Sequence, residues 1–150
     1  MTAATRDRTL FVLSLAIGVA GWWGATALGG PREAWDGPSY WQAVVPATYL
    51  LCALFGYLGS RGAWRWPFLA FGAQVATMLV LGGGTGNLFP LGLALFAVMA
   101  AIGLVPAYLG VALRRARDRS RAAAFAAKAR REAMAGEPHS GARGEGGPGR

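Results

Sequence analysis

Few side chains in this chain of 150 residues could carry acid–base, nucleophilic or metal chemistry. Glu33 and Asp36 lie three residues apart. Paired carboxylates can act as a general acid and a general base where a cleft shifts their pKa values, but the surrounding sequence indicates no cleft. Cys52 is the single cysteine and His139 the single histidine, which argues against a redox pair, a disulfide and a haem or metal ligand set. We therefore expect no enzyme activity, no catalytic residue, no bound metal and no cofactor.

Asp36 belongs to the segment "GGPREAWDGPSYW" (residues 29–41), in which Asp-Gly-Pro favours a turn. The flanking aromatic rings are apolar in body and polar at one edge, which suits the surface of a membrane. The preferred interpretation is an interfacial turn in which Asp36 also caps the following helix. The alternative is a catalytic or cation-binding role. The predicted turn residues are Trp35, Asp36, Pro38, Tyr40 and Trp41.

Mild polar side chains interrupt the apolar stretches. Gln74 is followed three residues later by Thr77, on roughly the same helix face, and Thr48 and Tyr49 are adjacent in another stretch. An amide in hydrocarbon usually hydrogen-bonds to a neighbouring helix, which contributes about 1 kcal/mol. We expect Gln74 to join two helices. The alternative is that Gln74, Thr77, Tyr49 and Thr48 border a solute pocket.

The glycine-rich segment "LGGGTGNLFP" (residues 81–90) has three interpretations. A phosphate-binding loop needs a Lys and a Ser or Thr after its last glycine, and Asn87, Leu88 and Phe89 follow instead. A selectivity filter needs a re-entrant segment, for which ten residues are too few. A tight turn is favoured, with Asn87 as the N-cap of the next helix. A backbone anion site at that helix end is the alternative.

Composition indicates the elements that must position these residues. Hydrophobic residues make up 54% of the chain and charged residues only 15%. Soluble domains carry about a quarter charged residues. The uncharged stretches match the roughly 17–25 residues that cross a bilayer, and none has the polar face that a soluble helix bundle requires. The sequence predicts an all-α membrane protein with two antiparallel helical hairpins. Its four spans are residues 9–29, 41–59, 67–82 and 88–113.

Basic residues predict the orientation. Of the 15 Lys and Arg residues, only Arg32 lies in a loop on the far side from the termini. Positive residues stay in the cytoplasm, so both termini, including residues 1–8, are expected there. We expect a multi-pass protein of the bacterial inner (plasma) membrane.

Small residues recur every four positions in all four spans, as in Gly72 with Ala76 and Gly103 with Ala107. Gly21, Ala25 and Gly29 form one such row, and Cys52 and Gly56 form another. Small residues let helix backbones approach closely where lipid supplies no hydrophobic drive. These five residues are predicted to pack helices together.

The character of the chain changes after Leu113. Residues 114–135 are rich in Ala, Arg and Lys and predict a basic cytoplasmic helix, whereas residues 136–150 are rich in Gly and polar residues and predict disorder. Anionic lipid headgroups are the expected partners of the basic helix. Nucleic acid is the less favoured alternative, because no aromatic platform or binding motif accompanies the charge. The predicted headgroup contacts are Arg114, Arg115, Arg117, Arg119 and Arg121.

Four motifs resemble a small family of bacterial inner-membrane proteins with four spans. They are W-D-x-P-x-Y-W (residues 35–41), L-x-G-Y-L (54–58), W-R-W (64–66) and N-L-F-P-L-G (87–92). The resemblance covers about residues 9–115 and implies a membrane location and a four-span architecture. It implies no catalytic residues, because no activity is assigned to the family.

Two classes of function are consistent with these patterns. The first is a non-enzymatic accessory or scaffold subunit of a larger membrane assembly, favoured by the small-residue rows. It implies a homo- or hetero-oligomeric membrane partner. The second is a transporter or oligomeric channel for a small neutral or lipophilic solute, with Gln74, Tyr49 and Thr48 near its pocket.

Overall fold

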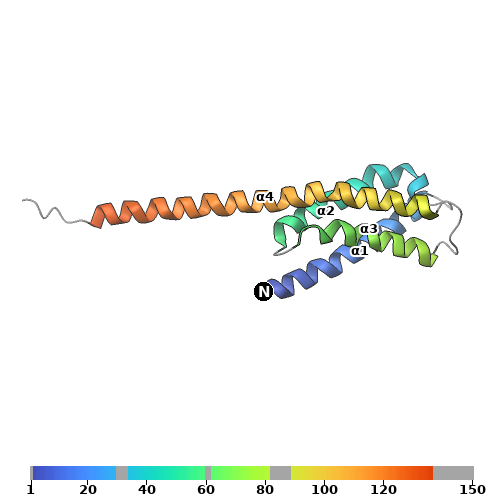
Figure 1. The fold of residues 1–150 in the computed structure, drawn as a ribbon, viewed down its shortest axis with the longest axis horizontal. Helices are drawn as coiled ribbons and strands as arrows, with labels where there is room; N and C mark the ends of the chain where they lie inside the picture. Colours follow the sequence, from blue (N-terminus) through green and yellow to red (C-terminus); the bar gives the residue numbers. More distant parts are fainter. Residues whose placement is uncertain (1, 30–33, 60–61, 82–88, 137–150) are drawn as a thin grey trace, which may run out of the picture. The chain divides into compact units, whose positions relative to one another are not determined.

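The computed structural model describes residues 2–29, 34–59, 62–81 and 89–136, and every element in these ranges is helical. Four are α-helices, and two shorter elements precede the second of them (Figure 1). The α-helices are α1 (Ala3–Gly29), α2 (Val45–Leu58), α3 (Arg65–Leu81) and α4 (Phe89–Gly136). The shorter elements are the 3₁₀-helix η1 (Ala34–Asp36) and the π-helix η2 (Tyr40–Val44).

Three helices among the described residues are long and apolar enough to cross a membrane: Ala3–Ala27, Tyr40–Leu58 and Pro90–Met134. The third predicted span, residues 67–82, corresponds to α3, which is not one of these three. Its 17 residues extend about 25 Å, somewhat less than the roughly 30 Å of a hydrocarbon core. The fold is therefore consistent with a membrane protein that has several spans. The length of α3 alone does not support its assignment as one of them.

The helix boundaries differ from the predicted spans for local reasons. α1 begins at Ala3 rather than at residue 9, because the Thr2 hydroxyl accepts a 3.2 Å hydrogen bond from the Thr5 amide and caps the helix. Before α3, Gly62 has a φ of +60°, a conformation that glycine adopts without strain, and α3 then begins at Arg65.

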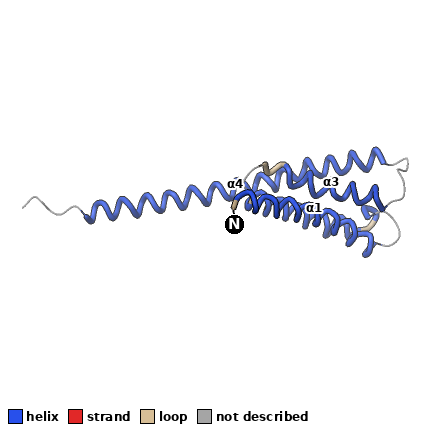
Figure 2. Tube along the Cα trace, turned by 90° about the horizontal axis from the view of Figure 1, so that it is seen from below, coloured by secondary structure: helices blue, strands red, loops and turns tan. Residues whose placement is uncertain are grey.

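Residues Met1–Arg114 form one compact unit, in which α1 and α3 run in the same direction. A Cβ on Gly18 would overlap the backbone of Ala70, and a Cβ on Gly21 would lie 3.8 Å from the Gln74 amide nitrogen. Helix α2 runs opposite to α1 and α3 and in the same direction as α4, and it contacts both α3 and α4 (Figure 1). Figure 2 shows the same bundle from below.

Two groups of buried side chains form the core of this unit. One includes Trp22, Tyr40, Phe71, Phe96 and Met99, and joins α1, η2, α3 and α4. The other lies towards the start of α1 and α3, and its members are Leu10, Cys52, Phe55, Ala63, Trp66 and Ala107. Large apolar side chains such as Val80, at 81% exposure, cover the outside. This surface of exposed apolar side chains suits hydrocarbon rather than water.

The second unit is Arg115–Arg150, of which the structure describes residues 115–136 of α4. The side chains of residues 115–134 are exposed, and the Lys128 ammonium nitrogen lies 3.7 Å from a Glu132 carboxylate oxygen one turn away. The predicted disordered tail, apart from residue 136, lies outside the described residues. The same holds for most of the glycine-rich segment, including Asn87.

Candidate functional site

A π-helical segment sets the position of Tyr40. η2 has the wider turn of a π-helix, a rare conformation that often occurs at functional sites. Tyr40 is fully buried, whereas Trp41 next to it is 45% exposed. Tyr40 thus lies in a helix and inside the unit, rather than in a turn on its surface. Its phenol ring is apolar enough for the core, and its hydroxyl has a partner there.

That partner is Gln74 on α3. The Tyr40 hydroxyl donates a 2.6 Å hydrogen bond to Gln74 Oε1, and both side chains have 0% exposure. Gln74 Nε2 has no hydrogen-bond partner among the described residues. A buried amide donor without an acceptor costs about 1–3 kcal/mol. The pair therefore joins η2 to α3 and leaves one donor of the amide unused.

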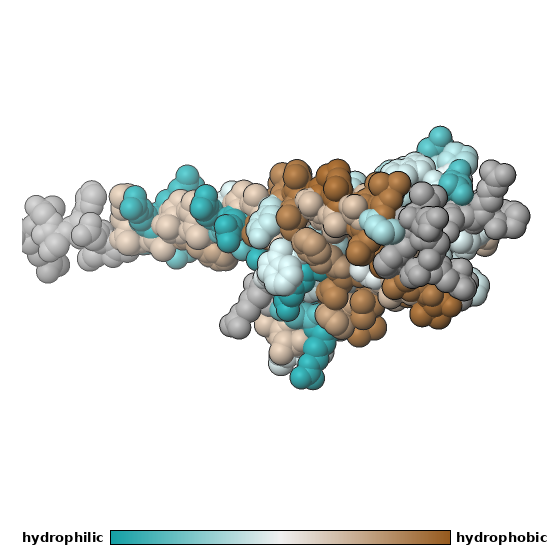
Figure 3. Space-filling view, turned by 45° about the vertical axis from the view of Figure 1, so that its right-hand side comes forward, coloured by the Kyte–Doolittle hydropathy of each residue, from teal (hydrophilic) through white to brown (hydrophobic). Residues whose placement is uncertain are grey.

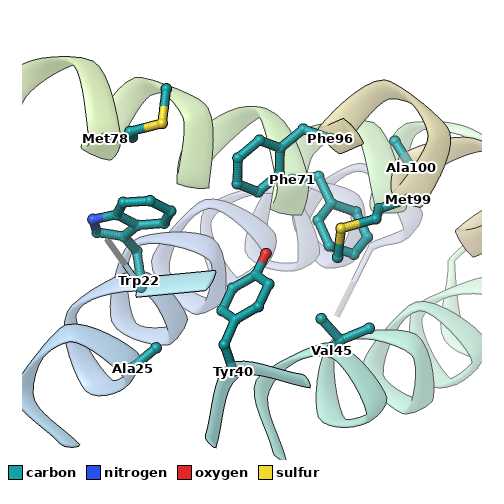
Figure 4. Packing of buried hydrophobic residues seen from close by; sticks show 10 residues of the cluster. Trp22, Ala25, Tyr40, Val45, Phe71, Met78, Phe96, Met99 and Ala100 are labelled. Atoms are coloured by element: carbon teal, nitrogen blue, oxygen red, sulfur yellow. The ribbon is translucent and has the colours of Figure 1, made fainter. Parts of the chain in front are cut away.

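Aromatic side chains enclose this pair. The Trp35 ring packs edge-on against the Trp22 ring, with 5.8 Å between their centroids, and its centroid lies 5.7 Å from that of Phe96. Figure 4 shows Tyr40 pointing from η2 towards the middle of the cluster, between Trp22 and Phe71. The Trp41 indole donates to the Trp35 carbonyl at 2.7 Å, which fastens η1 to η2. The segment predicted as an interfacial turn is folded partly into the helix unit.

Asp36 does not cap the second helical segment as expected. It is the last residue of η1 and is exposed, and Pro38 is exposed as well. Ser39 occupies the N-cap position of η2 with a helical backbone, and its side chain makes no capping hydrogen bond. The chain therefore enters η2 without a side-chain cap, and Asp36 does not act as one.

The four polar residues predicted to border a pocket bond to different groups. The Thr48 hydroxyl donates to the Val44 carbonyl at 2.8 Å, within the same helical segment, and the Thr77 hydroxyl donates to the Ala73 carbonyl at 2.7 Å, within α3. The Tyr49 hydroxyl donates to the Met99 carbonyl of α4 at 3.2 Å. With Gln74 bonded to Tyr40, the structure does not bring the four into one polar site.

The predicted packing residues lie at helix contacts to different degrees. A Cβ on Gly56 would overlap the Ala107 backbone, a Cβ on Gly21 would lie 2.9 Å from a Val44 methyl, and both Ala25 and Cys52 are buried. The contacts of Gly29 lie outside the described residues. Two further close approaches occur at Gly18, which lies beside the first row, and at Gly103, which is spaced four residues from Ala107. Sequence reasoning missed a third, at Gly110.

An apolar groove of about 420 Å³ lies on the outer face of α1 and α3. Ala76 and Thr77 on α3 face Val19 and Trp23 on α1 across it. Outside the groove lining, neither Gly24 on α1 nor Gly72 on α3 would meet another atom within 4 Å if it carried a Cβ, so both border open space. The remaining lining residues are Leu15, Ala73 and Val80.

Charged side chains gather where α1 and α3 begin. Arg65 lies 3.9 Å from Asp7, and its guanidinium lies 5.3 Å from the centre of the Trp66 ring. The Arg114 guanidinium donates to the Gly59 carbonyl at the end of α2, so this predicted headgroup contact is bonded to the protein. Arg115, Arg117, Arg119 and Arg121 are exposed in the second unit.

The glycine contacts described above are contacts between packed helices. Within the described residues no group of three or more His, Cys, Asp or Glu side chains could hold a metal ion. The Tyr40–Gln74 pair was not predictable, because no residue pattern marks the π-helical turn that faces Tyr40 inward. The exposed small residues of the groove were partly visible in the Gly72–Ala76 spacing.

Comparisons with protein-family models, curated proteins and solved structures find no match to this chain, so the family resemblance of its four motifs stays an expectation.

Proposed function

We propose that the protein is a non-enzymatic accessory or scaffold subunit in the bacterial inner membrane, which uses the α1–α3 groove to hold a transmembrane helix of a partner. The single observation behind this proposal is the open apolar groove. In the core, Tyr40 bonds to Gln74 and Tyr49 bonds to backbone, whereas Ala76 and Val80 on the groove are exposed (Figure 3 shows apolar side chains over one face).

The shape of the groove suits a helix. Gly72 and Ala76 are both exposed and lie one turn apart on α3. Small residues at this spacing let a second backbone approach closely, and van der Waals packing then drives association in lipid. Trp23, at 55% exposure on the α1 side, adds a large contact surface. A partner helix would thus cover residues that otherwise face lipid.

Four spans with cytoplasmic termini remain the proposed topology. The close approach of Gly18 to Ala70 favours placing α3 in the membrane beside α1, despite its shortness. Arg65 and Arg114 belong to the same end of the unit as the start of α1, and the positive-inside tendency assigns that end to the cytoplasm.

The test uses a photo-crosslinking amino acid at Ala76, with Ala101 on the exposed part of α4 as the matched control. A discrete adduct from position 76 in intact membranes, absent from position 101, is expected. Mass spectrometry of the adduct distinguishes a second copy from a different membrane protein. Adducts with lipid alone at both positions would contradict the proposal.

A transporter for a small neutral solute is the second candidate, favoured by the unused Gln74 Nε2 donor in the core. A solute carbonyl could accept from this group if η1 and η2 moved aside. Liposomes containing the wild type should then show a flux that Gln74→Leu abolishes. An equal flux from both proteins would remove this candidate.

A further inference from the structure

The second unit presents an exposed helix that carries one aromatic side chain. Residues 115–134 of α4 are all exposed, and Phe125, at 72% exposure, is the single aromatic residue among them. Large aromatic side chains supply much of the binding energy where one protein surface packs on another. The surroundings of Phe125 on the helix therefore indicate what could pack there.

Phe125 lies on an uncharged face of this helix. Residues three, four and seven positions apart share one side of an α-helix, because each residue turns the chain by about 100°. Between residues 121 and 134, five uncharged side chains fall within an arc of about 100° around Phe125. These five residues form the Phe125 face: Ala122, Phe125, Ala126, Ala129 and Ala133. Because alanine side chains are short, the Phe125 ring projects beyond its neighbours.

Basic side chains border the Phe125 face. Arg121 lies along one edge and Arg130 along the other, each about 90° from the middle of the face. Glu132 lies near one edge, but its carboxylate is 3.7 Å from the Lys128 ammonium group, so these two charges offset each other. Over the whole exposed segment, seven basic and two acidic side chains leave a charge of +5. This charge complements an acidic partner and repels a second copy of the same segment.

A basic helix with an apolar face suits either an acidic protein groove or an anionic membrane surface. Helices that lie in a membrane surface bury large side chains such as Trp, Phe and Leu. The Phe125 face has one such side chain and four alanines, which remove little apolar area from water when they enter lipid. Short side chains instead let the helix backbone approach a protein surface closely. The composition of the face therefore favours a protein.

We propose that the Phe125 face docks into an apolar groove with an acidic rim on a partner protein. The Phe125 ring is the anchor, and Arg121 and Arg130 face the rim. Helix-in-groove recognition commonly uses apolar anchors at helical spacing. This inference rests on the proposed accessory role, and it gives the protein a second contact with its assembly, outside the membrane.

The experiment uses the full-length protein in the cells that naturally produce it, with a photo-crosslinking amino acid at Ala129. Ala127, on the opposite side of the helix, is the matched control. Position 129 should give an adduct whose partner peptide, identified by mass spectrometry, carries an excess of Asp and Glu, and position 127 should not. Adducts with lipid, nucleic acid or a second copy, or equal adducts from both positions, would overturn the proposal. The absence of any adduct from position 129 would do so as well.

The yield of this adduct tests the anchor. Phe125→Ala should lower the yield about tenfold, as expected for truncation of an aromatic anchor. Met134→Ala is the matched control, since Met134 is 76% exposed and lies on another side of the helix. Both variants gain the best helix former, so neither should unfold the segment. A wild-type yield from Phe125→Ala, or equal losses from both variants, would refute the anchor.

An enlarged alanine distinguishes a protein groove from a membrane surface. With the crosslinker moved to Ala126, Ala129→Leu should lower the yield of the protein adduct, because the longer side chain prevents close approach. The same substitution would strengthen burial in lipid. An unchanged yield of protein adduct, or its replacement by lipid adducts, would contradict docking into a protein.

Two neighbouring arginines test the acidic rim. Arg130→Gln removes a charge at the edge of the Phe125 face and should lower the adduct yield roughly two- to fivefold. Arg131→Gln removes the same charge from the far side of the helix and should have less effect. Equal losses would show attraction without a defined rim and overturn that part of the proposal.

The crosslinker at Ala76 tests the proposed function separately. An adduct from Ala76 without one from Ala129 would overturn the docking of α4 and leave the groove between α1 and α3 as the contact with the partner. An adduct from Ala129 alone would remove the groove-based proposal and retain the contact made by the Phe125 face.

Discussion

Glycines occur on both helix pairs, α2 with α4 and α1 with α3, but only some of them contact the opposite helix. Where α2 meets α4, a Cβ on either Gly56 or Gly110 would overlap the backbone of the opposite helix. Where α1 meets α3, Gly18 makes an equally close approach, but Gly24 and Gly72 face open space. Small residues thus permit close approach, and which helix arrives is decided by the rest of the packing.

A glycine that already contacts another helix differs in its effect on stability from a glycine on an open face. Glycines already in contact stabilise the unit, because each allows carbon and oxygen atoms of two backbones to touch. Glycines on an open face stabilise nothing inside the chain and lower helix propensity by up to about 1 kcal/mol each. Such residues are understandable if something outside the chain packs on them.

The largest effect is expected at the α2–α4 contact. Gly56→Ala should force the helices apart at Ala107 and cost about 1–3 kcal/mol of stability, as overpacking commonly does. Gly72→Ala is the matched control, which should be neutral or slightly stabilising because its Cβ meets nothing. Denaturant unfolding in detergent measures both. Equal losses of stability from the two variants would contradict the inference that Gly56 is packed against another helix and Gly72 is not.

A smaller effect is expected on the buried side of α3, at Tyr40 and Gln74. Tyr40→Phe leaves both polar atoms of the Gln74 amide unpaired and should cost about 1–2 kcal/mol, towards the lower end for an unsatisfied buried group. Gln74→Leu leaves only the Tyr40 hydroxyl unpaired and should cost less. The double variant removes all of these groups and should approach wild-type stability. A double-mutant cycle measures the coupling, and additive losses would show that the hydrogen bond contributes little.

The smallest effect is expected where α1 and α3 begin. Asp7→Asn removes one partner of a 3.9 Å ion pair whose side chains are partly exposed, and such pairs are worth about 0–1 kcal/mol. The α1–α3 contact should survive, since it depends on Gly18 and its apolar neighbours. Thermal unfolding at low and high salt checks this. A loss as large as that of Gly56→Ala would make the ion pair, rather than packing, the main support of α1 against α3.

The helical class and the approximate helix positions follow from the sequence because long apolar stretches without charge have few other structures in a membrane protein. Gln74 was recognised because an amide in an apolar stretch needs a partner. Its partner was not, because Tyr40 belongs to a Trp- and Pro-rich segment whose composition suits a membrane surface equally well. Gly56 and Gly72 each follow a phenylalanine in an apolar stretch. Composition therefore could not tell the glycine that contacts another helix from the one that faces open space.

The π-helical turn of η2 makes the chain sensitive to length rather than to side-chain identity in this segment. The side chains of Gln42 and Ala43 are exposed, so many substitutions at these two positions would leave the core untouched. Removing either residue would let an ordinary α-helix form, and each residue of such a helix turns the chain by about 100°. Tyr40 would then rotate away from Gln74, and η1 with Trp35 would follow. This segment therefore tolerates substitutions but not the deletion of a residue.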